Sequence, residues 1–212
     1  MFSIIQAAGW PIWPLLLCSV LALALVFERA FSLRTAKVAP PRLLDEAIAV
    51  STRALPSPEV IRQLEQNSAL GEVLAAGFKA LVSHPGATED DLRSATEAAG
   101  RLSAQRLERY LGALATIASA APLLGLLGTV IGMIEIFGSQ SAAASGGSNP
   151  AQLAQGISIA LYNTAFGLMV AIPSLICWRY FRARVDAHLL ALELAAERFV
   201  RHLTQVRQLR RL

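Results

Sequence analysis

Two apolar runs of 26 residues each dominate this sequence of 212 residues. Residues 112–137 carry one charged side chain, Glu135, and residues 153–178 carry none. A helix of that length measures about 39 Å at about 1.5 Å per residue, which exceeds the roughly 30 Å of a bilayer's hydrocarbon core. Each run is therefore predicted to cross a membrane.

The composition supports a helical membrane protein. Hydrophobic residues make up 54% of the chain and charged residues 16%, whereas soluble domains hold about 45–50% and about 25%. A shorter apolar run ends at Glu28 and Arg29 and predicts a further span over residues 10–31. It can also be interpreted as a signal peptide, but no Lys or Arg precedes it. A disulfide scaffold, a porin barrel and an ordinary soluble enzyme are excluded.

The basic residues predict the orientation of the spans. Ten of the 19 Lys and Arg residues lie between residues 32 and 111, and eight follow residue 178. None lies in residues 1–9 or 138–152. Because cytoplasmic segments carry the Lys/Arg excess, the N-terminus is predicted outside and the C-terminus inside. The predicted order is an outer N-terminus (1–9), a first span (10–31), a cytoplasmic helical domain (32–111), a second span (112–137), an outer loop (138–152), a third span (153–180) and a cytoplasmic C-terminal helix (181–212).

The fold class predicted is an all-α membrane protein whose second and third spans continue into a cytoplasmic helical bundle. Thr88 is the predicted start of one helix of nearly 50 residues, with Asp91 closing its cap and Pro122 as its kink. Beyond the third span, apolar residues recur at heptad spacing. That stripe can pack against the cytoplasmic part of the second helix in the same subunit, against a neighbouring subunit around a vestibule, or both; it comprises Val185, Leu189, Leu192, Ala196, Phe199, Leu203 and Val206.

Small residues form one face on each long span. Such faces let membrane helices approach closely, so plain helix packing is one interpretation of them. The glycines concerned are Gly125, Gly128 and Gly132 in the second span and Gly156 and Gly167 in the third.

Hydroxyl and amide groups accompany these glycines near the middle of the membrane. Thr129 and Thr164 are predicted about 12 and 16 Å from the outer boundary, with Asn163 beside Thr164. Hydroxyls cannot store a proton at physiological pH, so a proton-driven device needs a carboxylate whose pKa is raised by burial. Glu135 is the carboxylate between the two interfaces, and it lies near the outer end of its span.

Residues 121–133 and 155–173 carry motifs that are specific in combination. They are Leu-Gly-Thr-Val followed by Gly132, then Asn-Thr-Ala with Gly167 and Ala-Ile-Pro; Glu28-Arg29 also ends the first span. In these features the chain resembles the MotA/TolQ/ExbB proton-channel family, most of all its ExbB/TolQ branch. The resemblance covers the three spans.

The resemblance implies a bacterial inner-membrane homopentamer around the single spans of an ExbD- or TolR-like dimer. The partner's membrane Asp would carry the proton, and force would pass to TonB or TolA. Thr129 and Thr164 match the polar positions that face that Asp. Many members have a Glu where this chain has Ile159, which leaves the partner's carboxylate as the main carrier; for Glu135 we expect a role at the outer mouth or between subunits.

The predicted function is therefore a stator subunit of an ExbB–ExbD–TonB-type complex, with TolQ-like and non-conducting scaffold roles as alternatives. We expect no enzyme activity, no cofactor and no nucleic-acid partner. His84, His188 and His202 lie outside the spans without metal or triad spacing and are interpreted as surface residues. Cys18 and Cys177 lie at opposite depths, so no disulfide is expected between these two buried thiols.

Overall fold

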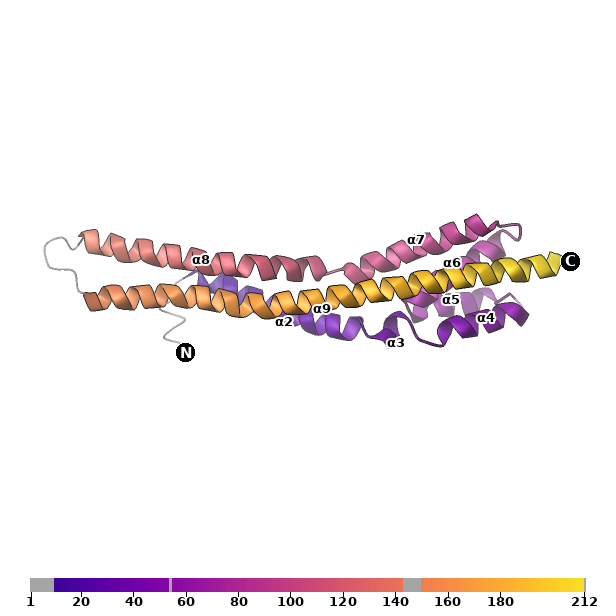
Figure 1. Ribbon diagram of the computed structural model, residues 1–212, viewed down its shortest axis with the longest axis horizontal. Coiled ribbons are helices and arrows are strands. Elements are labelled where there is room, and N and C mark those ends of the chain that lie inside the picture. The colour runs from indigo at the N-terminus through magenta and orange to yellow at the C-terminus, as the bar shows by residue number, and fades with distance from the viewer. Residues whose placement is uncertain (1–9, 54, 143–149, 212) are drawn as a thin grey trace. The chain divides into compact units, whose positions relative to one another are not determined.

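All the secondary structure described is helical in the computed structural model, which describes residues 10–53, 55–142 and 150–211 (Figure 1). The chain divides into two compact units. The first, here called the apolar unit, comprises Met1–Glu28 and Tyr110–Tyr180, and the second, the charged unit, comprises Arg29–Arg109 and Phe181–Leu212. Three stretches of helix are long and apolar enough to cross a membrane.

The apolar unit contains most of α2 (Ile12–Ser32), all of α8 (Leu111–Ala142) and the first part of α9 (Pro150–Arg211). Figure 1 shows α8 and α9 running side by side, joined by the segment that carries the expected outer loop. Residues 143–149 of that loop lie outside the described residues, while 138–142 belong to α8 and 150–152 to α9.

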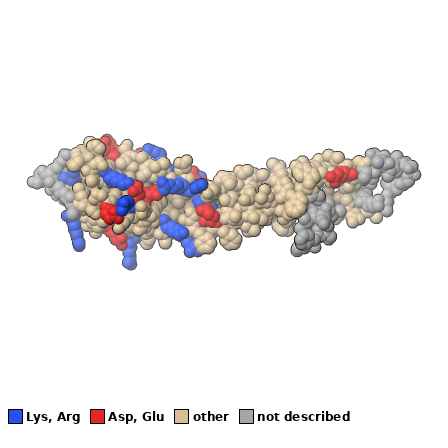
Figure 2. All heavy atoms as spheres, turned by 180° about the vertical axis from the view of Figure 1, so that it is seen from behind, with Lys and Arg blue, Asp and Glu red and all other residues tan. Residues whose placement is uncertain are grey.

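The charged unit contains short helices packed around the C-terminal part of α9, and Lys, Arg, Asp and Glu gather over it in Figure 2. Its core centres on Phe78 and Phe199, whose rings meet edge to face with centroids 4.9 Å apart. Phe199 belongs to the heptad stripe, so the stripe packs within the subunit against α6, a helix that the prediction did not name. The helices are α3 (Thr35–Val38), α4 (Leu43–Arg53), α5 (Pro58–Asn67), α6 (Ala69–Ser83) and α7 (Glu89–Glu108).

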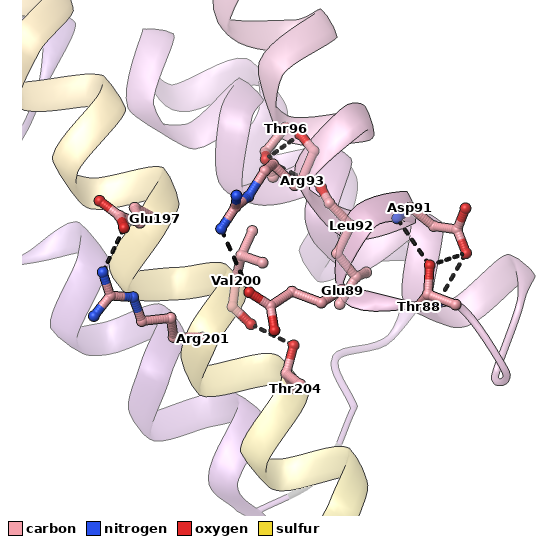
Figure 3. Close-up of polar contacts among 10 residues, drawn as sticks. All are labelled: Thr88, Glu89, Asp91, Leu92, Arg93, Thr96, Glu197, Val200, Arg201 and Thr204. Carbon is pink, nitrogen blue, oxygen red and sulfur yellow. Dashed lines mark hydrogen bonds and ion pairs between the residues drawn. The ribbon is translucent and has the colours of Figure 1, made fainter.

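The start of α7 is closed by the predicted capping box. Thr88 Oγ1 accepts the Asp91 backbone N–H, while the Asp91 carboxylate accepts the Thr88 backbone N–H at 2.7 Å (Figure 3). The Thr88 backbone and hydroxyl hydrogen bonds hold the pKa of Asp91 below its ordinary value.

The predicted single helix of nearly 50 residues is wrong, because the chain breaks it before Pro122. Helix α7 ends at Glu108, Tyr110 has a φ of 68°, and α8 begins at Leu111. A non-glycine residue with positive φ cannot continue a right-handed helix. Arg29, only 3% exposed, donates a hydrogen bond of 2.9 Å from its guanidinium to the carbonyl of Leu107. A side chain 78 residues away along the chain thus caps this helix end.

The interpretation of all three histidines as surface residues is wrong for His188, which is 6% exposed. Its Nε2 lies 3.1 Å from the Leu33 carbonyl oxygen just beyond α2, a contact that requires the proton on Nε2. His84 is exposed, and His202 is half-buried with Nε2 3.0 Å from Ser51 Oγ. The contact between His188 and the Leu33 carbonyl satisfies the hydrogen-bonding capacity of both buried groups.

Candidate functional site

The two long helices of the apolar unit touch backbone to backbone where their glycines meet. A Cβ at Gly125 would lie 2.8 Å from the Asn163 carbonyl oxygen and 3.0 Å from Thr164 Cα. A Cβ at Gly167 would lie 2.6 Å from the Ala121 carbonyl oxygen. No side chain fits in such a space, so these two positions need glycine for the close approach.

The seam continues toward the outer end of both helices. A Cβ at Gly128 would lie 2.7 Å from Cβ of Asn163, one at Gly132 would lie 3.1 Å from Cβ of Ala160, and one at Gly156 would lie 2.6 Å from Ile136 Cδ1. Small residues thus line the seam for about three helical turns. Each of the five glycines that the sequence marked faces the other helix, although only Gly125 and Gly167 contact each other.

The side-chain hydroxyl of Thr164 has no hydrogen-bond partner among the described residues of its own subunit. Its side-chain Oγ1 is buried and makes no hydrogen bond to any described residue. Buried polar atoms are almost always hydrogen-bonded, and leaving one unpaired costs about 1–3 kcal/mol. Asn163, the preceding residue, is 3% exposed and packs against Gly128.

Thr129 lies on the neighbouring turn of the same seam. It follows Gly125 by four residues, and residues so spaced stand about 5–6 Å apart on one helix face. Since Gly125 touches Thr164, Thr129 lies about one helical turn, roughly 6 Å, farther along α8 than the level of Thr164. Thr129 is half-buried, donates its hydroxyl to the Leu126 carbonyl at 2.7 Å, and borders an open hollow of about 490 Å³.

Glu135 lies apart from this pair of threonines. It is exposed on α8, and six residues from Thr129 place it about 120° away around the helix at 3.6 residues per turn. The carboxylate therefore does not share the surface that Thr129 borders. The side chain of Ile159, where the resemblance expects Glu in many members, is outside the described residues.

The chemistry available at this seam is limited to hydroxyl and amide groups. In the part of the chain that the structure describes, no group of three or more His, Cys, Asp or Glu residues could hold a metal ion. Cys18 and Cys177 are free thiols, half-buried instead of buried as expected. A hydroxyl can donate and accept hydrogen bonds and so relay a proton, but it does not store one at neutral pH.

Residues 65–194 match the MotA/TolQ/ExbB proton channel family. The chain belongs to that family. It is 36% identical to an ExbB-like biopolymer transport protein of Synechocystis over 178 residues, which cover 84% of this chain and 83% of the relative. It is 32% identical to the biopolymer transport protein exbB1 of Vibrio cholerae over 173 residues, 80% of this chain and 73% of that one.

A relative from the Tol-Pal system matches equally broadly. The TolQ protein of Pseudomonas aeruginosa is 33% identical over 183 residues, which cover 81% of this chain and 77% of the relative. Membership in the family makes this chain a membrane-embedded proton-channel subunit of an energy-transducing complex.

Sequence reasoning missed Arg29 as a structural residue. The charge was visible at the end of the first span, but its target, the Leu107 carbonyl, depends on how α2 and α7 fold back on each other. A buried arginine beside a helix C-terminus stabilises that end through the helix dipole as well as through the hydrogen bond.

Proposed function

We propose that this chain is the inner-membrane stator subunit of an ExbB–ExbD–TonB-type complex. Protons cross where the second and third spans meet a partner's single span, and the partner's Asp carries them. Each elementary charge crossing the membrane delivers about 2.3 kcal/mol per 100 mV, which is enough to bias a two-state element. The complex turns that energy into force on a TonB-like protein.

The observation that carries this proposal is the unused hydroxyl of Thr164. Its Oγ1 is covered by its own subunit and makes no hydrogen bond there, so we infer that the side chain turns toward a partner's acid when the complex assembles. Asn163 is the adjacent residue, Thr129 lies about one helical turn farther along α8, and none of the three side chains can hold a proton at neutral pH. An acid on a partner helix supplies both the missing hydrogen bond and the proton carrier.

The complex that fits this role is a pentamer around a dimer of single-span subunits. Its topology places residues 1–9 and the 138–152 loop in the periplasm, and residues 32–111 and 181–212 in the cytoplasm. The Lys and Arg residues on both cytoplasmic segments support that orientation. Glu135, exposed on another side of α8, then lies at the outer mouth or between subunits.

Thr164→Val tests the proposal, because valine keeps the shape of threonine and removes the hydroxyl. The variant is reconstituted in liposomes with the ExbD-like partner, and proton uptake is measured under an imposed potential. We expect at least a tenfold loss of partner-dependent flux with assembly intact, since no hydrogen bond within the subunit is broken. Thr164→Ser is expected to restore most of the flux.

The matched control is Thr116→Val on α8. Thr116 is exposed and donates its hydroxyl to the Gly112 carbonyl at 2.9 Å, far from the seam, so flux is expected to stay unchanged. Normal flux in Thr164→Val would refute the proposal.

Two alternatives are separated by other measurements. If the chain is a TolQ-like subunit, its deletion is expected to cause detergent sensitivity, whereas deletion of an ExbB-like subunit is expected to abolish siderophore uptake. The similarity to the TolQ protein supports the TolQ-like alternative. A non-conducting scaffold predicts no partner-dependent flux in the unsubstituted protein.

A further inference from the structure

The break between α7 and α8 has no cause in the local sequence. Residues 105–115 contain no proline, and most of them are Gln, Arg, Leu, Glu or Ala, which favour a helix. Tyr110 nevertheless has a φ of 68°, in the left-handed region that is unfavourable for a residue with a Cβ. A group from elsewhere in the chain must therefore stabilise the break.

The guanidinium of Arg29 contacts the carbonyl on which the continuity of the helix depends. Arg29 donates a hydrogen bond of 2.9 Å to the Leu107 carbonyl. In an uninterrupted α-helix that carbonyl would accept the N–H of Leu111, four residues further on. The first backbone hydrogen bond of α8 instead runs from the Leu114 N–H to the Tyr110 carbonyl at 3.1 Å. Arg29 thus occupies the acceptor that would join α7 to α8.

Burial of Arg29 and continuity of the helix oppose each other. Arginine keeps its charge at physiological pH, and a buried charge needs hydrogen-bond acceptors and a favourable field. The C-terminal end of α7 supplies an open carbonyl and the negative end of the helix dipole. A helix that continued through residues 107–111 would use that carbonyl itself and would have no dipole end there. The buried guanidinium therefore favours the break, whereas the local sequence favours one helix.

Contacts with α9 hold the inner end of α2, and with it Arg29, in place. The Leu33 N–H bonds to the Arg29 carbonyl at 3.0 Å, so Leu33 lies one turn further on. The Leu33 carbonyl lies 3.1 Å from His188 Nε2 and 3.5 Å from Arg184 Nη2, both on α9. All these residues belong to the charged unit. A displacement of this end of α2 would therefore withdraw Arg29 from the Leu107 carbonyl.

We propose that the break between α7 and α8 is a conformational switch controlled by Arg29. With Arg29 on the Leu107 carbonyl the two helices are separate, and with Arg29 withdrawn residues 107–111 join them into one helix. An element with two such arrangements is what a conformational transition requires. Thr129 lies on α8, so the bearing of this switch on proton flux rests on the proposed function.

Hydrogen exchange at the amides of Leu111, Gly112 and Ala113 tests the switch. These amides begin α8 and have no acceptor within it, but they would be hydrogen-bonded in a continuous helix. Exchange is followed by mass spectrometry on the full chain in lipid nanodiscs. We expect Arg29→Met, which removes the donor and keeps an apolar stem, to slow it roughly tenfold or more. Unchanged or faster exchange in the folded variant would overturn the proposal.

The matched control for the lost charge is Arg34→Met. Arg34 is an exposed arginine five residues further along the chain, and its guanidinium carbon lies 4.7 Å from the centre of the Phe31 ring. We expect exchange at the start of α8 to stay unchanged in this variant. Equal slowing in Arg34→Met and Arg29→Met would show a general effect of charge and would contradict the role of Arg29.

A pair of substitutions at Tyr110 tests the switch without changing Arg29, and decides the question if Arg29→Met does not fold. Tyr110→Ile and Tyr110→Gly both remove the ring, but a β-branched residue resists positive φ whereas glycine adopts it readily. We expect slower exchange at the start of α8 in Tyr110→Ile and no slowing in Tyr110→Gly. Equal exchange rates in these two variants would refute the switch.

The failure of this proposal is distinguishable from failure of the proposed function, because exchange is measured without the partner. Partner-dependent proton flux together with unslowed exchange in the variants removes the switch and leaves the stator role. Slowed exchange in a protein without such flux confirms the switch and refutes the stator role.

Discussion

The apolar and charged units hold their helices together by different means. In the apolar unit α8 and α9 meet at glycines with carbonyl oxygens and Cα atoms in direct contact. Ion pairs join the helices of the charged unit: Lys79–Glu65 joins α5 to α6, Arg106–Glu72 joins α6 to α7, and Arg182–Glu108 joins α7 to α9.

The difference follows from the solvent that each unit meets. Lipid chains are as apolar as leucine, so helices in a membrane gain little from hiding side chains and rely on close packing. In water, burial of an apolar ring such as Phe199 stabilises the fold, while exposed ion pairs add only about 0–1 kcal/mol each. The two units are therefore expected to fail under different substitutions.

The largest effect is expected from Gly167→Val. Its Cβ would lie 2.6 Å from the Ala121 carbonyl oxygen, where neither backbone can yield without separating α8 from α9. We expect loss of the folded, assembled protein, measured as the monodisperse fraction after solubilisation. Gly112→Ala on α8 is the control, because a Cβ there meets nothing within 4 Å; a stable Gly167→Val protein would show that the seam is looser than described.

The next largest effect is expected from Phe199→Ala. The ring is fully buried against Phe78, and removing such a ring costs about 3–5 kcal/mol. We expect this loss in denaturant unfolding of the solubilised protein. Val60→Ala, at an exposed position, is expected to change stability little. If the Phe199→Ala protein still shows Thr164-dependent proton flux at low temperature, the charged unit can be destabilised without disrupting the apolar unit.

The smallest effect is expected from acid. Arg201 lowers the pKa of Glu197 below its ordinary 4.5, so this pair stabilises the charged unit above that value and loses its contribution as the pH falls through the lower folded pKa. We expect the melting temperature to fall as the pH drops below 4.5, and the fall to be smaller in Glu197→Gln. An identical acid profile in that variant would contradict a role for this pair.

The sequence predicted the parts of the molecule that depend on local pattern. The apolar runs predicted the helices long enough to span a membrane, and Thr88 with Asp91 predicted the cap of α7. The small-residue faces predicted the glycines that lie where α8 and α9 meet. It missed what depends on distant partners. The break at Tyr110 contains neither glycine nor proline, and the partner of His188 is a carbonyl 155 residues away along the chain.

The candidate site divides in the same way. The depth of Thr129 and Thr164 follows from residue counting, but the missing hydrogen bond of Thr164 emerges only when both helices are in place. The open space beside Gly100, where a Cβ would meet no atom within 4 Å, was also invisible in the sequence, because an isolated glycine in a helix has no signature that distinguishes an open space from a tight contact.

The glycine seam also has a mechanical consequence. Flexible side chains between two helices act as a cushion, since they can change rotamer when one helix is displaced. At Gly125 and Gly167 main-chain atoms abut and no such cushion exists. A displacement of α8 at these positions is therefore transmitted directly to α9, and the two helices move together as one rigid pair.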